Sequence, residues 1–598
     1  MTVTTSTSPA LHPYQDPDRT TGERVADLLG RMTLEEKAGQ LFHAMTTLGD
    51  QGELADDPQR AFGGHTVRQM VAEKGMTHFN LIGVATAREM AEWHNRVQEL
   101  AAATRLGIPV TLSTDPRHAF TDNPGTGMAA GPFSEWPESL GLAAIGDPEL
   151  VRQYADTVRR EYLAVGLRLA LHPQIDLATE PRWSRICNTF GEDADLAARL
   201  VAPYLQGLRG PGDELGPDSV SAVVKHFPGG GPQKDGEDPH FPYGREQVYP
   251  GGFFYYHLAP FRAALAAGAT QMMPYYGMPV GTRYEEVAFG FNRGIVTGLL
   301  REELGFDGIV LSDWGIISDS DIMGESHAAR AWGVEHLDRH ERILKALDAG
   351  VDQFGGETCP ELVVALVRDG RLPESRLDTS VSRVLAEKFR LGLFDDRRYV
   401  DPDHAEATVG RADFRALGAA AQRRSVTLLK NTDNLLPLPG RPRLFLQGIA
   451  PGTAAAYGRL VDNPADADLA VIRLDTPFEP RSGLFESFFR AGRLDFTPER
   501  LADILDLLGK VPTVVAIHLD RPAVIPEIAE RAHALLAVYG ASDQALLDVL
   551  FGRARPEGQL PFQLPRSMAE VEQGHPDVPQ ESTHPVYPFG HGLDYTAR

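Results

Sequence analysis

The sequence contains very little cysteine: only Cys187 and Cys359, far apart along 598 residues. A disulfide-stabilised fold needs several cysteines that can pair, and a cysteine metal cluster needs them closely spaced. The sequence therefore argues against both. We predict that the two thiols are ordinary buried residues.

Long uncharged apolar runs are also missing, and the first residues, MTVTTSTSPALHPYQDPDRTTGE, lack the basic start and the apolar core of a signal peptide. We therefore expect a cytoplasmic protein with no membrane partner. Positive charge is scarce as well, because the formal net charge is -24. Phosphate-rich surfaces would be repelled, so we expect no nucleic-acid partner and a neutral or small substrate.

The chain is rich in short apolar runs that alternate with helical segments. A length of 598 residues is too great for one core and predicts two domains. In the first part of the chain, apolar runs alternate with helical segments such as 147–166 and 292–305. This alternation predicts a parallel sheet, one run short of a closed eightfold barrel. The seven runs cover residues 79–86, 108–115, 167–176, 221–227, 269–276, 308–314 and 349–354.

Titratable and aromatic side chains stand at the carboxyl ends of these runs. In a barrel of parallel strands, the functional groups come from these ends and from the loops that follow them. The sequence therefore predicts a convergence of the following side chains: Asp115, Asp176, Lys225, His226, Tyr276 and Asp313.

A polar stretch at residues 394–414 marks the exit from the first domain, and a second set of apolar runs follows it. These runs are again separated by helical segments, which predicts a second α/β domain with an open sheet. They cover residues 425–431, 442–449, 467–475, 511–520 and 532–540. We place the first domain at 1–395, a linker at 396–420 and the second domain at 421–598.

The run GIVLSDW, residues 308–314, sets an acid beside an aromatic residue. Asp313 at a strand end could simply cap the next helix. The adjacent Trp314 favours a sugar site, because an aromatic ring packs well on the weakly apolar face of a sugar. Met273, Tyr275 and Tyr276 could complete such a floor, although each is also an ordinary core residue.

The segment SAVVKHFPGGG carries the second group of candidates. Lys225 and His226 are consecutive, so both reach one cavity only if the strand breaks there. Pro228 and the three glycines after it favour such a break, since glycine adopts backbone angles closed to other residues. A glycine run can also hold phosphate, but neither GxGxxG nor GxxxxGK[ST] surrounds this one.

In their order along the chain, these segments resemble the motifs of glycoside hydrolase family 3, the β-glucosidase and exo-β-glucanase group. The motifs are MTLEEKAGQL, STDPRH, PRWSRICNTFGED, KHFPGG, LREELGFDGIVLSDWG, SVTLLKNTDNLLPLP and YPFGHGLDY. The resemblance implies a TIM-like (β/α)8 barrel followed by an αβα sandwich, with the active site between them. It also implies a retaining glycosidase with Asp313 as nucleophile, an oligosaccharide or glycoside as substrate, and no metal or cofactor.

The resemblance also assigns side chains to substrate binding. Asp115, with His118 as its companion, matches the pattern that holds the outer hydroxyls of the terminal sugar. Charge-assisted hydrogen bonds from such groups fix the orientation of the sugar. We add Trp314 as the aromatic floor. The other predicted binding residues are Arg185, Lys225, His226, Met273 and Tyr276. Ser184 stands where the family usually has Gly, which could reshape the pocket.

The resemblance implies that the acid/base residue lies on a loop of the second domain, after the run at 467–475. Glu479 stands closest to the end of that run and is our prediction. Glu486 is the alternative, although its helical spacing in LFESFFRAG is typical of a surface residue.

Three alternatives stay open. The N-acetylglucosaminidase branch of the same family uses an Asp-x-His pair, which Asp238 and His240 could supply. A lyase could form a Schiff base on Lys225, which requires an uncharged amine. A carbohydrate-binding protein without catalysis is the third. We predict a retaining exo-β-glucosidase whose pocket is closed by Asp115 behind the terminal sugar, and leave a homo-oligomer as a possibility.

Overall fold

The computed structural model describes residues 12–55, 57, 62–123, 125 and 127–595. Eight parallel strands close into a barrel, which confirms the predicted fold of the first domain. The order around the barrel is β1, β12, β9, β7, β5, β4, β3 and β2. Their bounds are β1 Phe42–Thr47, β2 His78–Ile82, β3 Thr111–Thr114, β4 Leu167–Ala170, β5 Ser221–Phe227, β7 Gln271–Pro274, β9 Ile309–Trp314 and β12 Gln353–Gly355.

The strand missing from the sequence prediction is β1. Two helices precede it, α1 (Thr21–Arg31) and α2 (Leu34–Gly39), and only two residues lie between the end of α2 and Phe42, so the helical pattern runs into the strand. The strand itself reads FHAMTT, with too few apolar residues to form a continuous run. Its partners, β2 and β12, close the barrel.

Helices cover the outside of the barrel and connect its strands. Polar caps fix several of their starts: Thr86 and Asp338 each accept the backbone N–H three residues on, from Glu89 and Glu341. The covering helices are α3 Val67–Ala72, α4 Ala87–Ala102, α5 Ser139–Ile145, α6 Pro148–Ala164, α7 Ala194–Arg209, α8 Phe254–His257, α9 Ala259–Ala266, the π-helix η9 Gly294–Glu303, α10 Arg339–Ala349, α11 Pro360–Arg368 and α12 Glu374–Arg390.

Two small sheets stand on loops that follow barrel strands. One pairs β10 (Ser320–Ile322) with β11 (Glu325–His327) as a hairpin after β9. The other pairs β6 (Glu246–Val248) with β8 (Met278–Val280), on the loops after β5 and β7. Both lie at the carboxyl end of the barrel, where they extend the walls around its mouth.

The second domain is an open six-stranded sheet in the order β13, β18, β17, β16, β14 and β15, parallel except for β13. Each of the five predicted runs contains a strand, and only the two-residue β15 was not predicted. The strands are β13 Thr427–Asn431, β14 Arg443–Gln447, β15 Arg459–Leu460, β16 Leu469–Asp475, β17 Thr513–His518 and β18 Ala534–Val538. The helices are α15 Pro451–Ala454, α16 Pro498–Leu508, α17 Pro526–Arg531, α18 Asp543–Leu550 and α19 Met568–Gln573.

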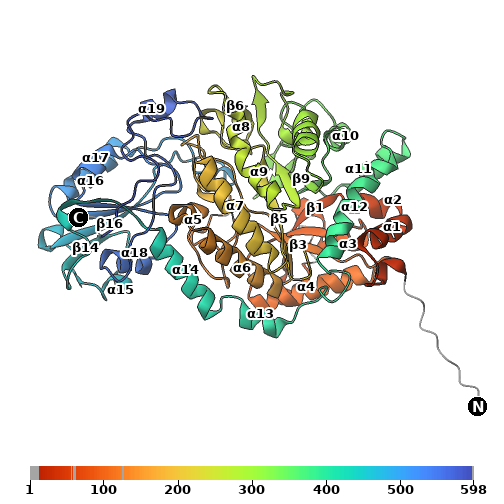
Figure 1. The fold of residues 1–598 in the computed structure, drawn as a ribbon, viewed down its shortest axis with the longest axis horizontal. Helices are drawn as coiled ribbons and strands as arrows, with labels where there is room; N and C mark the ends of the chain where they lie inside the picture. The colour runs from red at the N-terminus through yellow and green to blue at the C-terminus, as the bar shows by residue number, and fades with distance from the viewer. Residues whose placement is uncertain (1–11, 56, 58–61, 124, 126, 596–598) are drawn as a thin grey trace, which may run out of the picture.

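The segment predicted as a linker contains helix α13 (Pro402–Thr408) and most of helix α14 (Ala412–Ser425). In Figure 1 these two helices run along one edge of the molecule, between the barrel and the second sheet. Other contacts also join the two domains: Glu138 N donates to Tyr539 O at 2.9 Å, and Glu192 accepts the backbone N–H groups of Gln563 and Gln580.

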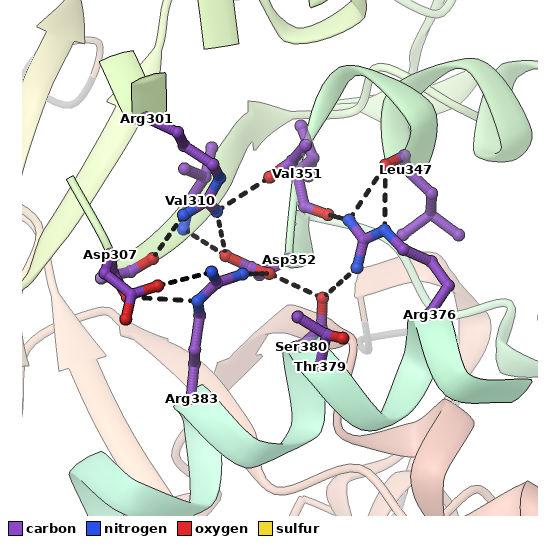
Figure 2. A network of polar contacts seen from close by, with 12 residues as sticks. Arg301, Asp307, Val310, Leu347, Val351, Asp352, Arg376, Thr379, Ser380 and Arg383 are labelled. Carbon is purple, nitrogen blue, oxygen red and sulfur yellow. Dashed lines mark hydrogen bonds and ion pairs between the residues drawn. The ribbon is translucent and has the colours of Figure 1, made fainter. Parts of the chain in front are cut away.

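A buried carboxylate fastens the amino-terminal end of the barrel. Asp352, just before β12, accepts Arg301 Nη2 at 2.6 Å and Val310 N at 2.9 Å on one oxygen. Its other oxygen accepts Ser380 Oγ at 2.6 Å and Arg383 Nη1 at 3.2 Å. Figure 2 shows that this network joins β9 and β12 to the π-helix η9 and helix α12. It lies at the end of the barrel opposite the predicted site, so its role is structural.

Both cysteines are buried, as predicted. None of the helices in the described part of the chain combines the length and apolar character needed to cross a membrane.

Candidate active site

The predicted residues of β3, β5, β7 and β9 meet at the carboxyl end of the barrel. Lys225 on β5 donates to Asp115 Oδ1, after β3, at 3.2 Å. The ring of His226 brings Nε2 to 3.9 Å from Asp313 Oδ2 on β9. After β7, Tyr276 donates its hydroxyl to the carbonyl oxygen of Trp314 at 2.7 Å. Strands far apart in sequence therefore supply one pocket.

A register shift within β5, in place of the predicted strand break, explains how two consecutive residues reach that pocket. The pairing of β5 with β7 shifts register between Lys225 and Phe227, so the side chains no longer alternate. The following glycines allow close packing: a Cβ at position 231 would lie 1.8 Å from Leu177 O. Gly230 N donates to Asp176 Oδ1 at 2.6 Å, so this amide is already engaged by the protein.

Asp313 presents one free oxygen. The residue is only 8% exposed, and Oδ1 accepts the backbone N–H of Trp314 at 2.8 Å. Oδ2 is buried and has no hydrogen-bond partner among the described residues. A buried carboxylate oxygen without a partner is costly, so a ligand that engages it is favoured.

His226 is held as a neutral ring. Its Nδ1 donates to Asp176 Oδ2 at 2.7 Å, and burial, aided by the charge of Arg185, keeps the pKa of His226 well below its usual value. Burial likewise raises the pKa of Asp176 to about 6, although the backbone N–H groups of Gly230 and His226 oppose this rise. With the proton on Nδ1, Nε2 carries a lone pair that can accept from a substrate hydroxyl.

Asp115 stands ionised at the far side of the pocket. Burial opposes its charge, but Lys225 and the amide of Asn80 outweigh that effect and hold the pKa of Asp115 below its usual value. Asn80 Nδ2 donates to Asp115 Oδ2 at 3.1 Å, which leaves Asn80 Oδ1 buried without a partner among the described residues. A carboxylate, an ammonium and an amide therefore stand together, which suits the binding of adjacent hydroxyls.

Arg185 joins the pocket from the loop after β4. Its Nη2 donates to Gln174 Oε1 at 3.0 Å, while Nε has no partner in the described part of the chain. Burial opposes the charge of Arg185, but Tyr275, Asp238 and Asp313 outweigh that effect and raise the pKa of Arg185 above its usual value. Arg185 is therefore a fixed cation near the free oxygen of Asp313.

Asp238 and His240 form a pair on the loop after β5. His240 Nδ1 bonds Asp238 Oδ1 at 2.6 Å, and Ser184 donates its hydroxyl to Asp238 Oδ2 at 2.9 Å. Burial opposes the charge of Asp238, but His240 and Arg185 hold the pKa of this carboxyl at about 2. The ring of His240 lies 4.8 Å from the ring of Tyr276, centroid to centroid.

Two of the predicted binding residues form the floor. Met273 is buried in an apolar layer inside the barrel with Leu171, Val223 and Leu311, and Trp314 packs against that layer. The indole Nε1 of Trp314 is buried and has no hydrogen bond within the described residues. The floor is therefore apolar, with one unused donor.

The structure corrects the prediction for His118. Its Nε2 bonds Glu161 Oε2 at 2.9 Å, and its ring packs against Phe133 and Tyr162. The ring is thus held between the barrel and helix α6, where it cannot accompany Asp115 on a sugar. His118 is three positions after Asp115 in the sequence, and this spacing did not reveal that the loop turns the side chain of His118 inward.

The two predicted proton donors lie on the loop 477–492, after β16. Glu479 is exposed; its backbone N–H donates to Ala491 O at 3.0 Å, and its carboxylate lies against Gly492. Glu486 lies on the part of the loop that contacts the barrel, where its carboxylate accepts the hydroxyl of Tyr243 and, at 3.4 Å, Gly483 N.

Two residues of the site, Asn80 and Arg330, were not predicted from the sequence. Asn80 stands within β2, and its only signal was a polar residue inside an apolar run. Arg330 follows the β10–β11 hairpin, is buried, and donates to the carbonyl oxygen of Trp314 at 3.4 Å, with its guanidinium 5.5 Å from the ring centre of Tyr276. No sequence pattern marked it.

A barrel with a free carboxylate oxygen among hydroxyl-binding groups, joined to an αβα domain that faces its mouth, has the architecture of a glycoside hydrolase. The chain matches the description "Glycosyl hydrolase family 3 N terminal domain" over residues 33–386 and "Glycosyl hydrolase family 3 C-terminal domain" over 450–595. The chain therefore belongs to glycosyl hydrolase family 3, as its motifs predicted.

Relatives and solved structures agree with this membership. The chain is 54% identical to probable beta-glucosidase C of Aspergillus flavus, over 97% of this chain and 92% of the relative. It is 44% identical to a periplasmic beta-glucosidase/beta-xylosidase of Dickeya chrysanthemi, over 98% and 92%. A β-glucosidase structure from Erythrobacter marinus superposes with a TM-score of 0.78 at 23% identity, covering 98% of this chain and 84% of that one. At this identity the likeness shows the fold alone.

Proposed function

We propose that the protein is a retaining exo-β-glucosidase that hydrolyses terminal non-reducing β-D-glucosyl residues. The observation that carries the proposal is the free, buried Oδ2 of Asp313 at the centre of the pocket. The names of the relatives, β-glucosidases at 53–54% identity, support glucose as the sugar.

Asp313 is the proposed nucleophile. Its Oδ2 attacks the anomeric carbon, the bond from that carbon to the leaving oxygen breaks, and a donor on the opposite side protonates that oxygen. Water, deprotonated by the same group, then opens the glycosyl-Asp313 ester. Arg185 supplies a positive charge near the attacking oxygen, and His226, whose Nε2 lies 3.9 Å from it, is neutral and does not protonate it.

The sugar hydroxyls are the proposed ligands of the polar groups around Asp313. Asp115 and Lys225 form a pair at 3.2 Å, with the amide of Asn80 beside them, and can clamp two neighbouring hydroxyls. Because this group would stand behind the terminal sugar, it supports an exo mode. The same ion pair opposes the lyase alternative, since a Schiff base needs the amine of Lys225 uncharged.

His240 is the proton donor that the geometry supports best, in place of Glu479. Its ring lies on Tyr276, which contacts the carbonyl beside Asp313, and the charge of Asp313 acts on the ring. Asp238 fixes the ring through Nδ1, which leaves Nε2 for the leaving oxygen. Glu486 lies on the same side, behind Tyr243, and is the second candidate.

Mechanism-based labelling tests the nucleophile. A 2-deoxy-2-fluoro-β-glucoside with a good leaving group should trap a glycosyl ester on Asp313, found by peptide mass spectrometry. Asp313→Ala should hydrolyse no aryl β-glucoside while it keeps the melting temperature of the wild type. Labelling at another carboxylate, or turnover by the Ala variant, would contradict the proposal.

Leaving-group dependence identifies the donor among three Ala variants, at His240, Glu479 and Glu486. Loss of the true donor should slow a phenyl glucoside strongly and a dinitrophenyl glucoside little, because the second leaves without a proton, and azide should restore turnover. We expect this pattern for His240→Ala. If it appears for either Glu variant instead, that residue is the donor. A wild-type preference for N-acetylglucosaminides over glucosides would overturn the sugar assignment.

A further inference from the structure

An unbroken series of rings leads from the nucleophile's pocket to the surface. The ring of His240 lies 4.8 Å from Tyr276 on one side and 4.8 Å from Phe489 on the other. Phe489 contacts Phe485 at 5.2 Å and Phe241 at 5.3 Å between ring centres. The two domains thus build one wall, in which His240 and Phe241 come from the barrel, and Phe485 and Phe489 come from the second domain.

The outer end of this wall is exposed and apolar. Tyr243 stacks on Phe241 at 5.5 Å and is 50% exposed. Leu484, next to Phe485, is 56% exposed, and so is Met323 at the turn of the β10–β11 hairpin. We call this set of residues the apolar rim: Tyr243, Met323, Leu484 and Phe485. Few large apolar side chains of the described chain are this exposed, and three of them stand at the mouth of one pocket.

Polar contacts near the rim join the second-domain loop to the barrel. Glu325 of the hairpin accepts Leu484 N at 3.0 Å and Phe485 N at 3.4 Å. Arg481 donates to both oxygens of Glu237, at 2.9 and 3.1 Å. These contacts fix the second-domain loop on the barrel and leave its apolar side chains as the free surface. A ligand bound at the apolar rim therefore contacts mainly carbon atoms.

We infer that the apolar rim is the binding surface for the leaving group, and that it selects glucosides with aryl or alkyl aglycones over those with a second sugar. The inference rests on the proposed function and deepens it. The leaving oxygen must lie next to the proton donor, and both His240 and Glu486 border this wall. The aglycone attached to that oxygen must then extend along Phe485 and Leu484. A second sugar would bring hydroxyls to a surface with few free partners, which costs free energy.

A homologous series of alkyl glucosides tests the inference. For methyl, butyl and hexyl β-glucosides, kcat/KM of the wild type should rise with chain length, by up to about fourfold for each methylene that is fully buried. Cellobiose should fall below butyl glucoside. A flat series, or a preference for cellobiose, would overturn the inference. Absence of any turnover of methyl β-glucoside would instead contradict the proposed function, so the two failures are distinguishable.

Two matched leucine variants localise the effect. Leu484→Ser should lower the ratio of kcat/KM for hexyl and methyl glucosides by about fourfold, as expected for one methylene equivalent of lost contact. Leu417→Ser removes a leucine that is also exposed, at 38%, but on helix α14, and should leave that ratio unchanged. An equal change in both variants, or an unchanged ratio in Leu484→Ser, would show that the rim does not bind the aglycone.

Discussion

Replacement of Glu192 by Gln should change how the stability of the protein depends on pH. Glu192 is 6% exposed at the domain interface and accepts Gln563 N at 2.7 Å and Gln580 N at 3.0 Å. Burial raises its pKa to about 7, against the opposing effect of these two N–H groups. The folded chain therefore keeps the proton well above the pH at which the unfolded chain, with a pKa near 4.5, releases it.

The sign and size of the effect follow from this difference. The Glu192 carboxyl binds its proton more tightly in the folded state than in the unfolded state. Its contribution to the free energy of unfolding is therefore largest below pH 4.5, where both states are protonated, and is lost as the pH rises from 4.5 to 7. The change from 4.5 to about 7 corresponds to about 3 kcal/mol. The Gln variant is neutral throughout. It has only one acceptor oxygen for the N–H groups of Gln563 and Gln580, so its free energy of unfolding should lie below that of the wild type near pH 4.5. Between pH 4.5 and 7.5, the difference between variant and wild type should shift by about 3 kcal/mol in favour of the variant.

Urea unfolding of both proteins at pH 4.5, 6.0 and 7.5, followed by tryptophan fluorescence, measures this difference. Glu214→Gln is the control, because it removes the same charge from an exposed position, and should follow the wild type at every pH. A difference between Glu192→Gln and the wild type that does not change with pH would refute the reasoning.

Three further changes have definite expected results. Asp352→Asn leaves Arg301 and Arg383 without their buried counter-charge and should lower the free energy of unfolding by about 3–5 kcal/mol in urea; an unchanged midpoint would contradict the structural role. Lys225→Met removes a charged donor to the sugar and should raise the KM for an aryl glucoside about tenfold or more; an unchanged KM would place the sugar elsewhere. Burial, opposed by Asp238, keeps the pKa of His240 below 6.5, so kcat/KM should fall on the alkaline side with a pKa below 6.5. If kcat/KM instead falls only above pH 7, and still does so in His240→Ala, another group is the proton donor.

Most of the fold was predictable because buried parallel strands are continuous apolar runs. Seven of the eight barrel strands overlap with predicted runs, and five of the six strands of the second sheet lie within them. The strand β1 was not predicted because helix α2 precedes it closely and its own sequence, FHAMTT, is half polar. Within the predicted linker, the helices α13 and α14 were not expected, because residues 394–414 read as a polar stretch.

The pocket was predictable where side chains follow directly from strand ends. Asp313, Lys225 and His226 lie on β9 and β5, and barrel geometry alone brings such positions together. His118 and Arg330 lie on loops, where direction depends on partners remote in sequence, Glu161 for one and the carbonyl oxygen of Trp314 for the other. Residue spacing carries no information about such partners.

The positions of Glu479 and Glu486, the two proton donors considered from the sequence, were the least predictable part of the site, for the same physical reason. Distance from the end of β16 favoured Glu479, since a side chain near a strand end usually stays near the sheet. The loop is instead drawn onto the barrel at its middle, by Arg481 on Glu237 and by Glu325 on the amides of Leu484 and Phe485. Its path is thus set by barrel residues about 160 and 240 positions earlier in the chain. A nucleophile rooted in a barrel strand, such as Asp313, can be recognised from local sequence, whereas the positions of Glu479 and Glu486 relative to it depend on the contacts between the two domains.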